Sequence, residues 1–372
     1  VNKRKLIPIF VIPLYFISIL ISPLSKNLYK LYKPLEFTNI EFKVQNSKAT
    51  DISLKNKKNI VIIYAEGFER SYLNNQLFPG LATKMRKLEE ESLSFHGMHT
   101  ALGTSWTIAG LVSSQCGLPL IRSSKFYPTS TCLSDILKSN GYSTGHIQGS
   151  SLVFSGTRNF LEAHNYQSLK GKNFLSKNST NSKMSSWGHY DNEVFKEARL
   201  TIDSSAKDDR PFYLTISTMD THHPKGHLSP SCRNSSVNIE NNDNSLQKAF
   251  KCSDFFITDF IRYIRKSKFS QETIIIVMSD HLSFRNIIND KIQDMERRNL
   301  FFINFHAKKL TGTIDKHGTH LDVGTTILSL LGSDYKIGLG TNLLSEDKTL
   351  YELHGSKTDE YLRSIKKKLE DN

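Results

Sequence analysis

The sequence predicts one α/β domain, a sheet with helices on both faces, preceded by a single amino-terminal transmembrane helix. Two short runs rich in Ile and Val, NIVIIYAE at 59–66 and TIIIVMSDH at 273–281, predict strands buried on both faces of a parallel sheet. Strand-like and helix-like segments alternate between these runs, which is the pattern of an α/β domain. An uncharged apolar stretch near the amino terminus predicts the membrane helix.

The membrane helix is expected over Leu6–Ser25, twenty uncharged residues that follow the basic cluster Lys3-Arg4-Lys5. At about 1.5 Å per residue such a helix spans roughly 30 Å, the thickness of a bilayer core. The basic cluster places the amino terminus in the cytoplasm and the rest of the chain outside. A cleaved signal peptide is the alternative, but no small-x-small cleavage site follows. Whether other spans precede this one is left open.

The chain divides into four segments on composition. We expect a basic tip and anchor over 1–25, a linker over 26–58, one domain over 59–345 and a charged tail over 346–372. The formal charge is +13, with 49 basic and 36 acidic residues, which favours anionic partners. The basic residues are scattered and no nucleic-acid-binding motif is present, so nucleic acid is not the expected partner.

Within the domain, apolar periodicity and turn residues predict the elements in order. Helices are expected over 79–94, 105–114, 134–140, 191–200, 253–266 and 321–331, and near the end of the tail. Further strands are expected over 92–100, 142–148, 211–218 and 299–306. The segment 168–186 is rich in Lys, Asn and Ser and is predicted to be a surface excursion outside the core.

The four cysteines fall into two close pairs without the CxxC spacing of a zinc site. An even number of cysteines in a chain that leaves the cytosol favours disulfides. Of the three possible pairings we prefer Cys116 with Cys132 and Cys232 with Cys252. Four buried free thiols are the alternative.

Polar residues stand where the two apolar runs end. Because ligands bind beyond the carboxyl ends of strands in such sheets, Glu66, Asp280 and His281 are expected at one rim. Two carboxylates and an imidazole are suitable metal ligands. The alternative is that Glu66 caps a helix and the other two lie in an ordinary loop.

A third rim segment is ALGTSWTIAGLVSSQCGLPL at 101–120, where a hydroxyl precedes an apolar helix. A helix amino terminus favours negative charge, and a divalent metal can lower the pKa of a Thr hydroxyl there. Thr104 or Thr107 could instead merely cap the helix. A fourth segment, TMDTHHPKGH at 218–227, places several His in one loop, where they could bind metal, hold an anion or move a proton.

Taken in order, the motifs NIVIIYAEGFE, GTSWTIAGLVSSQCGLPL, DTHHP and SDH resemble the sulfatase-like branch of the alkaline phosphatase superfamily. The closest likeness is to the membrane phosphoglycerol transferases that modify periplasmic glucans. It is carried by three segments, TIAGLVSSQCGLPL, FSGTRNFLEAHNY and SDHLSFRN. Lipoteichoic acid synthases and phosphoethanolamine transferases are more distant. The resemblance covers roughly 59–335 and implies the alkaline phosphatase fold.

The resemblance also implies roles for the metal site. Glu66, Asp280 and His281 match metal ligands, and Thr104 matches a nucleophile that is also a ligand. We prefer Thr104 to Thr107 because the family often carries a second hydroxyl three residues after the nucleophile.

For the substrate, the resemblance matches His222 to a catalytic and substrate-binding His before a Pro, with His223 as its alternate. His146, Arg158 and Trp106 are assigned to contacts with the transferred group. Two departures stand out: only one membrane span is visible, and Leu282 replaces the Gly that follows SDH in related synthases.

The implied activity is transfer of phosphoglycerol from phosphatidylglycerol to a periplasmic or cell-surface glycan through a phospho-threonine. One divalent cation is implied, Mn²⁺ or Mg²⁺, with Zn²⁺ as a further candidate. The domain is expected to face the periplasm from a bacterial inner membrane. Alternatives are a phosphoethanolamine transferase, a sulfatase or phosphodiesterase, or a non-catalytic binding protein. The formylglycine signature of sulfatases is absent around Thr104.

Overall fold

The computed structural model describes residues 47–121, 126–178, 183–205, 207–208, 210–234 and 237–365. Its centre is one eight-stranded sheet with the order β4-β3-β5-β1-β6-β7-β2-β8. The strands are β1 (Asn59–Ala65), β2 (Leu93–Phe95), β3 (Ser143–Gln148), β4 (Ser168–Lys170), β5 (Phe212–Ser217), β6 (Thr273–Ser279), β7 (Phe301–Phe305) and β8 (Gly312–Ile314). Both apolar runs are therefore central strands, and β1 lies between β5 and β6.

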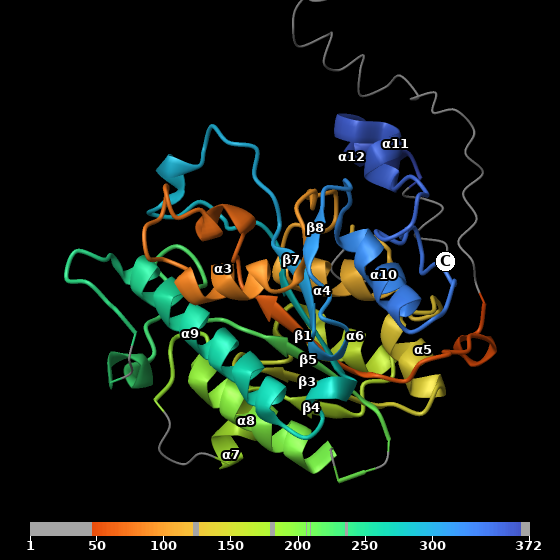
Figure 1. The fold of residues 1–372 in the computed structure, drawn as a ribbon, viewed down its shortest axis with the longest axis horizontal. Helices are drawn as coiled ribbons and strands as arrows, with labels where there is room; N and C mark the ends of the chain where they lie inside the picture. Colours follow the sequence, from red (N-terminus) through yellow and green to blue (C-terminus); the bar gives the residue numbers. More distant parts are fainter. Residues whose placement is uncertain are drawn as a thin grey trace, which may run out of the picture.

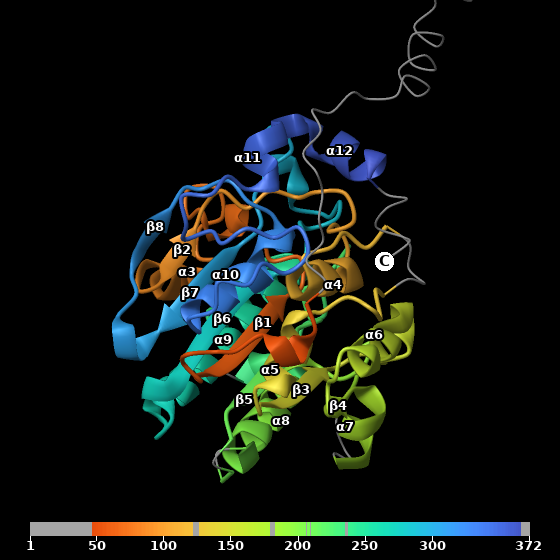
Figure 2. The same cartoon turned by 90° about the vertical axis from the view of Figure 1, so that its right-hand side faces the viewer.

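Helices cover both faces of the sheet (Figures 1 and 2). They are α3 (Thr83–Glu90), α4 (Thr107–Cys116), α5 (Leu133–Ser139), α6 (Thr157–Ala163), α7 (Lys172–Asn178), α8 (Asp191–Ser205), α9 (Ser245–Lys266), α10 (Val323–Leu330), α11 (Leu350–His354) and α12 (Thr358–Ser364). Alternate residues of β1 belong to separate cores. Ile60 and Ile62 pack with α4, α5 and α10, whereas Val61 and Ile63 pack with α3, α8 and α9. This alternation makes a three-layer sandwich and confirms the expected α/β architecture.

The sheet is mixed rather than wholly parallel. β7 runs antiparallel to β6 and to β2, while the other pairs are parallel. The direction of a strand depends on the path of the loop that precedes it. The apolar residues of β7 do not indicate this path, so the sequence did not predict an antiparallel strand. The short strand β8 was not predicted, since its residues are exposed or half-buried and lack a strand pattern.

The prediction for 168–186 was wrong in part. Its first residues form β4, which pairs in parallel with β3 at the edge of the sheet. α7 follows, and Leu175 is buried in the core beneath it. Only Leu175 and the partly buried Phe174 of α7 pack on the core, so the polar composition of the segment indicated a surface excursion.

The helix α9 is longer than predicted because it begins at Ser245. Asn244 accepts a hydrogen bond from the backbone N–H of Gln247, and the Gln247 side chain accepts one from the N–H of Asn244. This reciprocal capping box starts the helix inside a polar stretch. Leu246 and Phe250 in its first turns are buried.

The last part of the predicted linker packs on the domain. Ile52 and Leu54 are buried in the core, and the backbone N–H of Leu54 donates to the Asn140 side chain. Among the described residues, no helix combines the length and apolar character needed to cross a bilayer. The predicted span at 6–25 lies outside the described residues.

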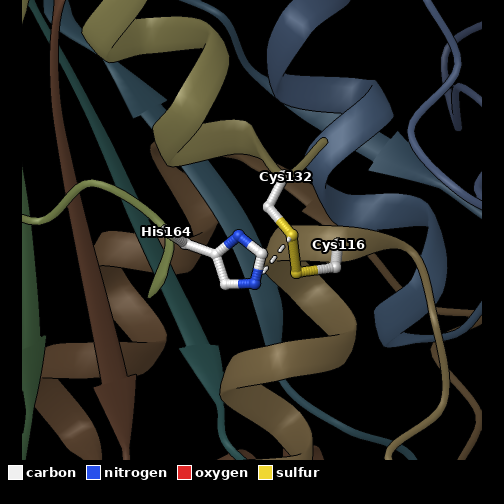
Figure 3. Close-up of side chains that lie close together, drawn as sticks. All are labelled: Cys116, Cys132 and His164. Atoms are coloured by element: carbon white, nitrogen blue, oxygen red, sulfur yellow. Dashed lines mark hydrogen bonds between the residues drawn. A yellow bond between two sulfur atoms is a disulfide. The ribbon is translucent and has the colours of Figure 1, made fainter. Parts of the chain in front are cut away.

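Both preferred disulfides are confirmed, Cys116 with Cys132 and Cys232 with Cys252. The first joins the last residue of α4 to the residue that precedes α5. In Figure 3 the His164 ring lies beside this disulfide, with its Nε2 3.7 Å from the Cys132 sulfur. Because both sulfurs are covalently paired, this cluster is not a metal site.

Candidate active site

The metal-ligand candidates meet because their strands are neighbours. In the register of the sheet Ala65 lies opposite Ser279, so Glu66 and Asp280 leave adjacent strands at the same level. On the other side of β1, Tyr64 pairs with Ser217, which brings the loop after β5 to the same rim. Parallel strands direct their carboxyl ends to one edge, as the sequence predicted.

Three buried side chains form the centre of the site. The Nε2 atom of His281 lies 3.6 Å from Oε1 of Glu66 and 3.4 Å from Oδ2 of Asp280. Each of the three residues is at most 2% exposed. The structure therefore brings together the three predicted ligands, although more than two hundred positions separate them in sequence.

The ring proton of His281 points away from the centre. Nδ1 of His281 lies 2.7 Å from the carbonyl oxygen of Leu282 and donates to it, which leaves the Nε2 lone pair facing the carboxylates. Oδ1 of Asp280 accepts hydrogen bonds from the N–H groups of Gly67 and His281, each at 2.9 Å. Oδ2 of Asp280 is buried and has no hydrogen-bond partner among the described residues.

The electrostatics of the centre favour a cation. Burial raises the pKa of Glu66 well above its usual value, and the neighbouring Asp280 carboxylate raises it further. Electron-pair donors that face each other in a buried space repel unless a positive charge lies between them. The orphaned Oδ2 of Asp280 is oriented to serve as a ligand, so the donor set fits a divalent metal ion.

The hydroxyl of Thr107 completes this set. Its Oγ1 lies 3.3 Å from Oε2 of Glu66 and 3.5 Å from Nε2 of His281. A carboxylate oxygen, an imidazole nitrogen and a hydroxyl oxygen are all ligand types that divalent cations accept in proteins. Thr107 is the first residue of α4, where unpaired N–H groups and the helix dipole favour negative charge.

The preference for Thr104 over Thr107 is corrected by this geometry. Thr104 is fully buried, and its hydroxyl donates to the carbonyl oxygen of Ala101 at 2.8 Å. The same hydroxyl accepts a hydrogen bond from the N–H of Ala101 at 3.0 Å. Thr104 thus closes the turn that leads into α4, and the hydroxyl that faces Glu66 and His281 belongs to Thr107.

Close packing holds α4 against the rim. A Cβ atom on Gly110 would lie 1.9 Å from the carbonyl oxygen of Asp280, so only glycine lets the helix approach so near. Farther along α4, Ser114 and Gln115 each form a 2.8 Å hydrogen bond with the hydroxyl of Tyr64 in β1. These contacts fix the first turn of α4 relative to the ends of β1 and β6.

His222 and His223 lie beside the centre, as predicted. Each offers a ring nitrogen within 4.8 Å of a carboxylate oxygen of Glu66. Nδ1 of His222 lies 2.9 Å from the carbonyl oxygen of His223, which assigns its proton to that nitrogen. Burial lowers the pKa of His222, so this imidazole is neutral near pH 7.

A pair of buried carboxyl groups anchors the histidine loop. Asp191 accepts hydrogen bonds from the N–H groups of Met219 at 2.8 Å and Asp220 at 3.3 Å, and Asp220 accepts one from the N–H of Asp191 at 3.1 Å. Burial raises the pKa of Asp191 to about 7. The start of α8 is thereby tied to the loop that carries His222.

The remaining predicted residues lie in different surroundings. His146 is a fully buried residue of β3 whose ring nitrogens lie 2.8 Å from Oγ1 of Thr215 and 2.9 Å from Oε1 of Gln148, so its assignment to the substrate is corrected. Arg158 is exposed on α6 and pairs with Glu162. Trp106 precedes α4 and packs partly buried on the core. Substrate contacts by Arg158 and Trp106 stay predictions.

Two residues near the centre carried only a weak signal in the sequence. Trp187 stands in a polar segment without periodicity, yet its ring centroid lies 4.2 Å from that of His222. His320 is fully buried behind Asp280, where its Nε2 donates to the carbonyl oxygen of Ser279 at 2.9 Å. Burial lowers the pKa of His320 to about 4. Neither contact can be read from residues so far apart in sequence.

Comparison with known proteins matches most of the chain to one family and to named relatives. A family model described as Sulfatase matches residues 58–333. Phosphoglycerol transferase I from Xanthomonas campestris pv. campestris (strain B100) is 33% identical over 346 residues, which cover 89% of this chain and 49% of that protein. Phosphoglycerol transferase I from Salmonella choleraesuis (strain SC-B67) is 37% identical over 299 residues, 78% of this chain and 39% of that protein. The chain thus spans half or less of these relatives.

Solved structures share the fold at low sequence identity. The lipoteichoic acid synthase LtaP from Listeria monocytogenes superposes with a TM-score of 0.66 at 16% identity, covering 80% of each chain. An alkaline phosphatase superfamily protein from Vibrio parahaemolyticus gives 0.65 at 22% identity, covering 83% of this chain and 76% of that one. The periplasmic domain of EcEptC from Escherichia coli, in complex with Zn, gives 0.56 at 13% identity, covering 82% and 90%.

Proposed function

The chain belongs to the sulfatase family, as its motifs indicated, and on this premise we propose that it is a metal-dependent phosphoglycerol transferase. The proposed donor is phosphatidylglycerol and the proposed acceptor is a glycan of the cell envelope. One observation carries the proposal: the Thr107 hydroxyl at the start of α4 faces Glu66 and His281. The name phosphoglycerol transferase I of the similar proteins supports the choice of transferred group.

The residues proposed to hold the metal ion are Glu66, Asp280, His281 and Thr107. A set of oxygens with one imidazole suits Mn²⁺, Mg²⁺ or Zn²⁺. A divalent cation bound there supplies a Lewis acid that lowers the pKa of a neighbouring hydroxyl and neutralises charge on phosphoryl oxygens.

In the first step Thr107 loses its proton and its oxygen attacks the phosphorus of the lipid. A bond forms between Oγ1 and phosphorus while the bond from phosphorus to the diacylglycerol oxygen breaks. N–H groups in the first turn of α4 stabilise the negative charge of the phosphoryl oxygens. The product is phosphoglyceryl-Thr107 and free diacylglycerol.

His222 is the proposed proton carrier of this step. Its Nδ1 proton is held by the carbonyl oxygen of His223, so its other nitrogen is free to accept the proton that leaves Thr107. His222 then passes the same proton to the diacylglycerol oxygen, which leaves as a hydroxyl, so His222 is neutral again. In the second step a glycan hydroxyl attacks the phosphorus and gives its proton to His222. The bond from phosphorus to Thr107 breaks, and the Thr107 oxygen takes that proton from His222, which restores both groups.

The compartment follows from the same proposal. Two disulfides form in oxidising surroundings such as the periplasm. The apolar stretch predicted at 6–25 would hold the domain beside the bilayer that contains the donor. We therefore place the domain on the outer side of the bacterial inner membrane.

The test follows a radiolabelled glycerol head group. The full chain, reconstituted with labelled phosphatidylglycerol and Mn²⁺, is expected to form labelled protein and then to label an added glucan. Thr107→Ala should abolish both signals, and Thr107→Ser should retain part of them because it keeps a hydroxyl. Chelation with EDTA should stop the reaction, and added Mn²⁺ should restore it.

Label retained on the Thr107→Ala protein at the wild-type level would contradict the assignment of the nucleophile. Label transferred from phosphatidylethanolamine instead of phosphatidylglycerol would contradict the choice of donor. The circular dichroism of each variant controls for folding.

A further inference from the structure

A row of ring side chains, called here the aromatic arc, leads from the metal-ligand candidates to the protein surface. It consists of Phe284, His223, His222, Trp187 and Phe154. Successive ring centroids are 4.8, 4.5, 4.2 and 5.5 Å apart. The end at Phe284, a residue that is itself 41% exposed, touches the site directly, because its ring lies 4.7 Å from that of His281. The arc is continuous although its members come from four segments of the chain.

The outer end of the arc is an exposed apolar tip. Val153 is 73% exposed and Phe154 is 58% exposed. Ser155 follows with a φ of +52°, an uncommon conformation for a residue with a side chain. A left-handed backbone at a surface turn has a free-energy cost, and such conformations cluster at functional sites. The turn presents two large apolar side chains to solvent at the rim of the active site.

A backbone bridge fixes this tip beside the rest of the arc. Ser150 and Gly188 form an isolated antiparallel bridge, which joins the segment before Val153 to the segment of Trp187. Gly188 allows this approach because a Cβ atom there would lie 2.2 Å from the carbonyl oxygen of Gly149. The tip immediately precedes α6, which lies on one flank of the sheet beside β4 and α7 (Figure 2).

Basic side chains flank the apolar tip. Val153, Arg158 and Lys172 line the same small cavity. The Arg158 side chain is 45% exposed and pairs with Glu162 one helical turn away. The chain as a whole carries a formal charge of +13. An apolar tip with cationic neighbours is complementary to the surface of an anionic bilayer.

We propose that Val153 and Phe154 insert into the lipid bilayer surface, so that the aromatic arc forms a passage for the donor head group from the membrane to Thr107. This inference rests on the proposed function, because a phosphatidylglycerol donor brings two acyl chains that the polar, buried metal site cannot accept. The acyl chains stay at the exposed tip, and the phosphate reaches the site along the rings.

A glycan is the other ligand that aromatic side chains can bind. Sugar platforms combine a flat ring with hydrogen-bonding groups for the hydroxyls. Val153 offers neither a ring nor a polar group, and it is the most exposed member of the tip. The basic flank likewise suits a phospholipid surface better than a neutral sugar, so the lipid is favoured.

The first test uses tryptophan fluorescence. The chain contains two tryptophans, Trp106 and Trp187, so Trp106→Phe leaves Trp187 in the arc as the single reporter. In vesicles of phosphatidylglycerol with brominated acyl chains, the fluorescence of Trp187 should be quenched. The further double substitution V153S/F154S should remove most of this quenching. The matched control Leu200→Ser replaces another exposed apolar residue, 56% exposed on α8, and should leave quenching unchanged.

The second test compares two donors with the full chain. V153S/F154S should lower kcat/KM for phosphatidylglycerol in vesicles by about tenfold, because two apolar side chains no longer leave water on binding. Hydrolysis of the soluble diester bis(4-nitrophenyl) phosphate should stay within about twofold of wild type. Leu200→Ser should change neither activity.

Three results would overturn the inference. Unchanged quenching and unchanged vesicle activity in V153S/F154S would show that the tip does not meet lipid. An equal loss on both donors would assign the tip a structural role. A raised KM for the glycan acceptor alone would make the arc a sugar platform. If wild type cleaves neither donor, the proposed function fails instead, and the quenching experiment still decides the contact with lipid.

Discussion

At the scale of single residues, the active site depends on which of two similar hydroxyls is free. Thr104 and Thr107 lie three positions apart, but Thr104 exchanges both of its hydrogen bonds with Ala101. Thr107 has its hydroxyl next to Glu66 and His281. The hydroxyl of Thr104 therefore stabilises a turn, whereas the hydroxyl of Thr107 faces the metal-ligand candidates.

This difference predicts opposite outcomes for the same substitution. Thr104→Val should lower the free energy of unfolding by about 1–3 kcal/mol, because the buried N–H of Ala101 loses its acceptor. The diesterase activity of the folded protein should remain. Thr107→Val is the matched control and should abolish activity with a smaller loss of stability. Urea unfolding and hydrolysis of bis(4-nitrophenyl) phosphate measure both, and an inactive but stable Thr104→Val protein would reverse the assignment.

At the scale of elements, the helix α3 is capped by a group that another helix supplies. The residue before α3 is Ala82, which provides no side-chain cap. Asp254 of α9 takes this role, because its carboxylate accepts hydrogen bonds from the N–H groups of Lys84 at 3.1 Å and Met85 at 2.6 Å. Packing between α3 and α9 thus includes a cap donated across the interface.

Removal of this cap should destabilise the domain without affecting the site. We expect Asp254→Ala to lower the free energy of unfolding by about 1–2 kcal/mol. Asp259→Ala on the same helix is the control: that residue pairs with Arg199 and Arg262 at the surface, and its loss should cost less than about 1 kcal/mol. Thermal unfolding of both variants measures the difference. Equal shifts would mean that the cap contributes no more than a surface ion pair.

At the scale of the whole molecule, two disulfides close loops of different importance. Cys116–Cys132, with a separation of 16 residues, holds the end of α4. Cys232–Cys252, with a separation of 20 residues, closes a loop that contains none of the candidate site residues. In both cases the covalent bond lowers the conformational entropy of the unfolded chain.

The two disulfides should therefore differ in their effect on activity. The double substitution C232A/C252A should lower the free energy of unfolding by about 2–4 kcal/mol and leave diester hydrolysis unchanged. C116A/C132A should lower stability by a similar amount and also reduce activity, because α4 carries Thr107. Denaturant unfolding and initial rates separate the two effects. Full activity in folded C116A/C132A would show that packing alone positions α4.

The sequence by itself determined the fold class, the central strands and three residues of the candidate site. Short runs rich in Ile and Val favour buried strands, and polar residues that follow neighbouring parallel strands are then expected at one rim. The preferred disulfide pairing was one of three that the sequence allowed, and the structure shows it. These features depend on local pattern and on one general rule of parallel sheets.

Only the tertiary structure decided which threonine faces the metal-ligand candidates, that His146 is a core residue, and that β7 runs antiparallel. A hydroxyl or an imidazole is available for chemistry when no neighbour has taken its hydrogen bonds. Those neighbours, such as Thr215 for His146, lie tens of residues away. Periodicity reports the burial of a side chain, whereas its partners are fixed only when the elements pack.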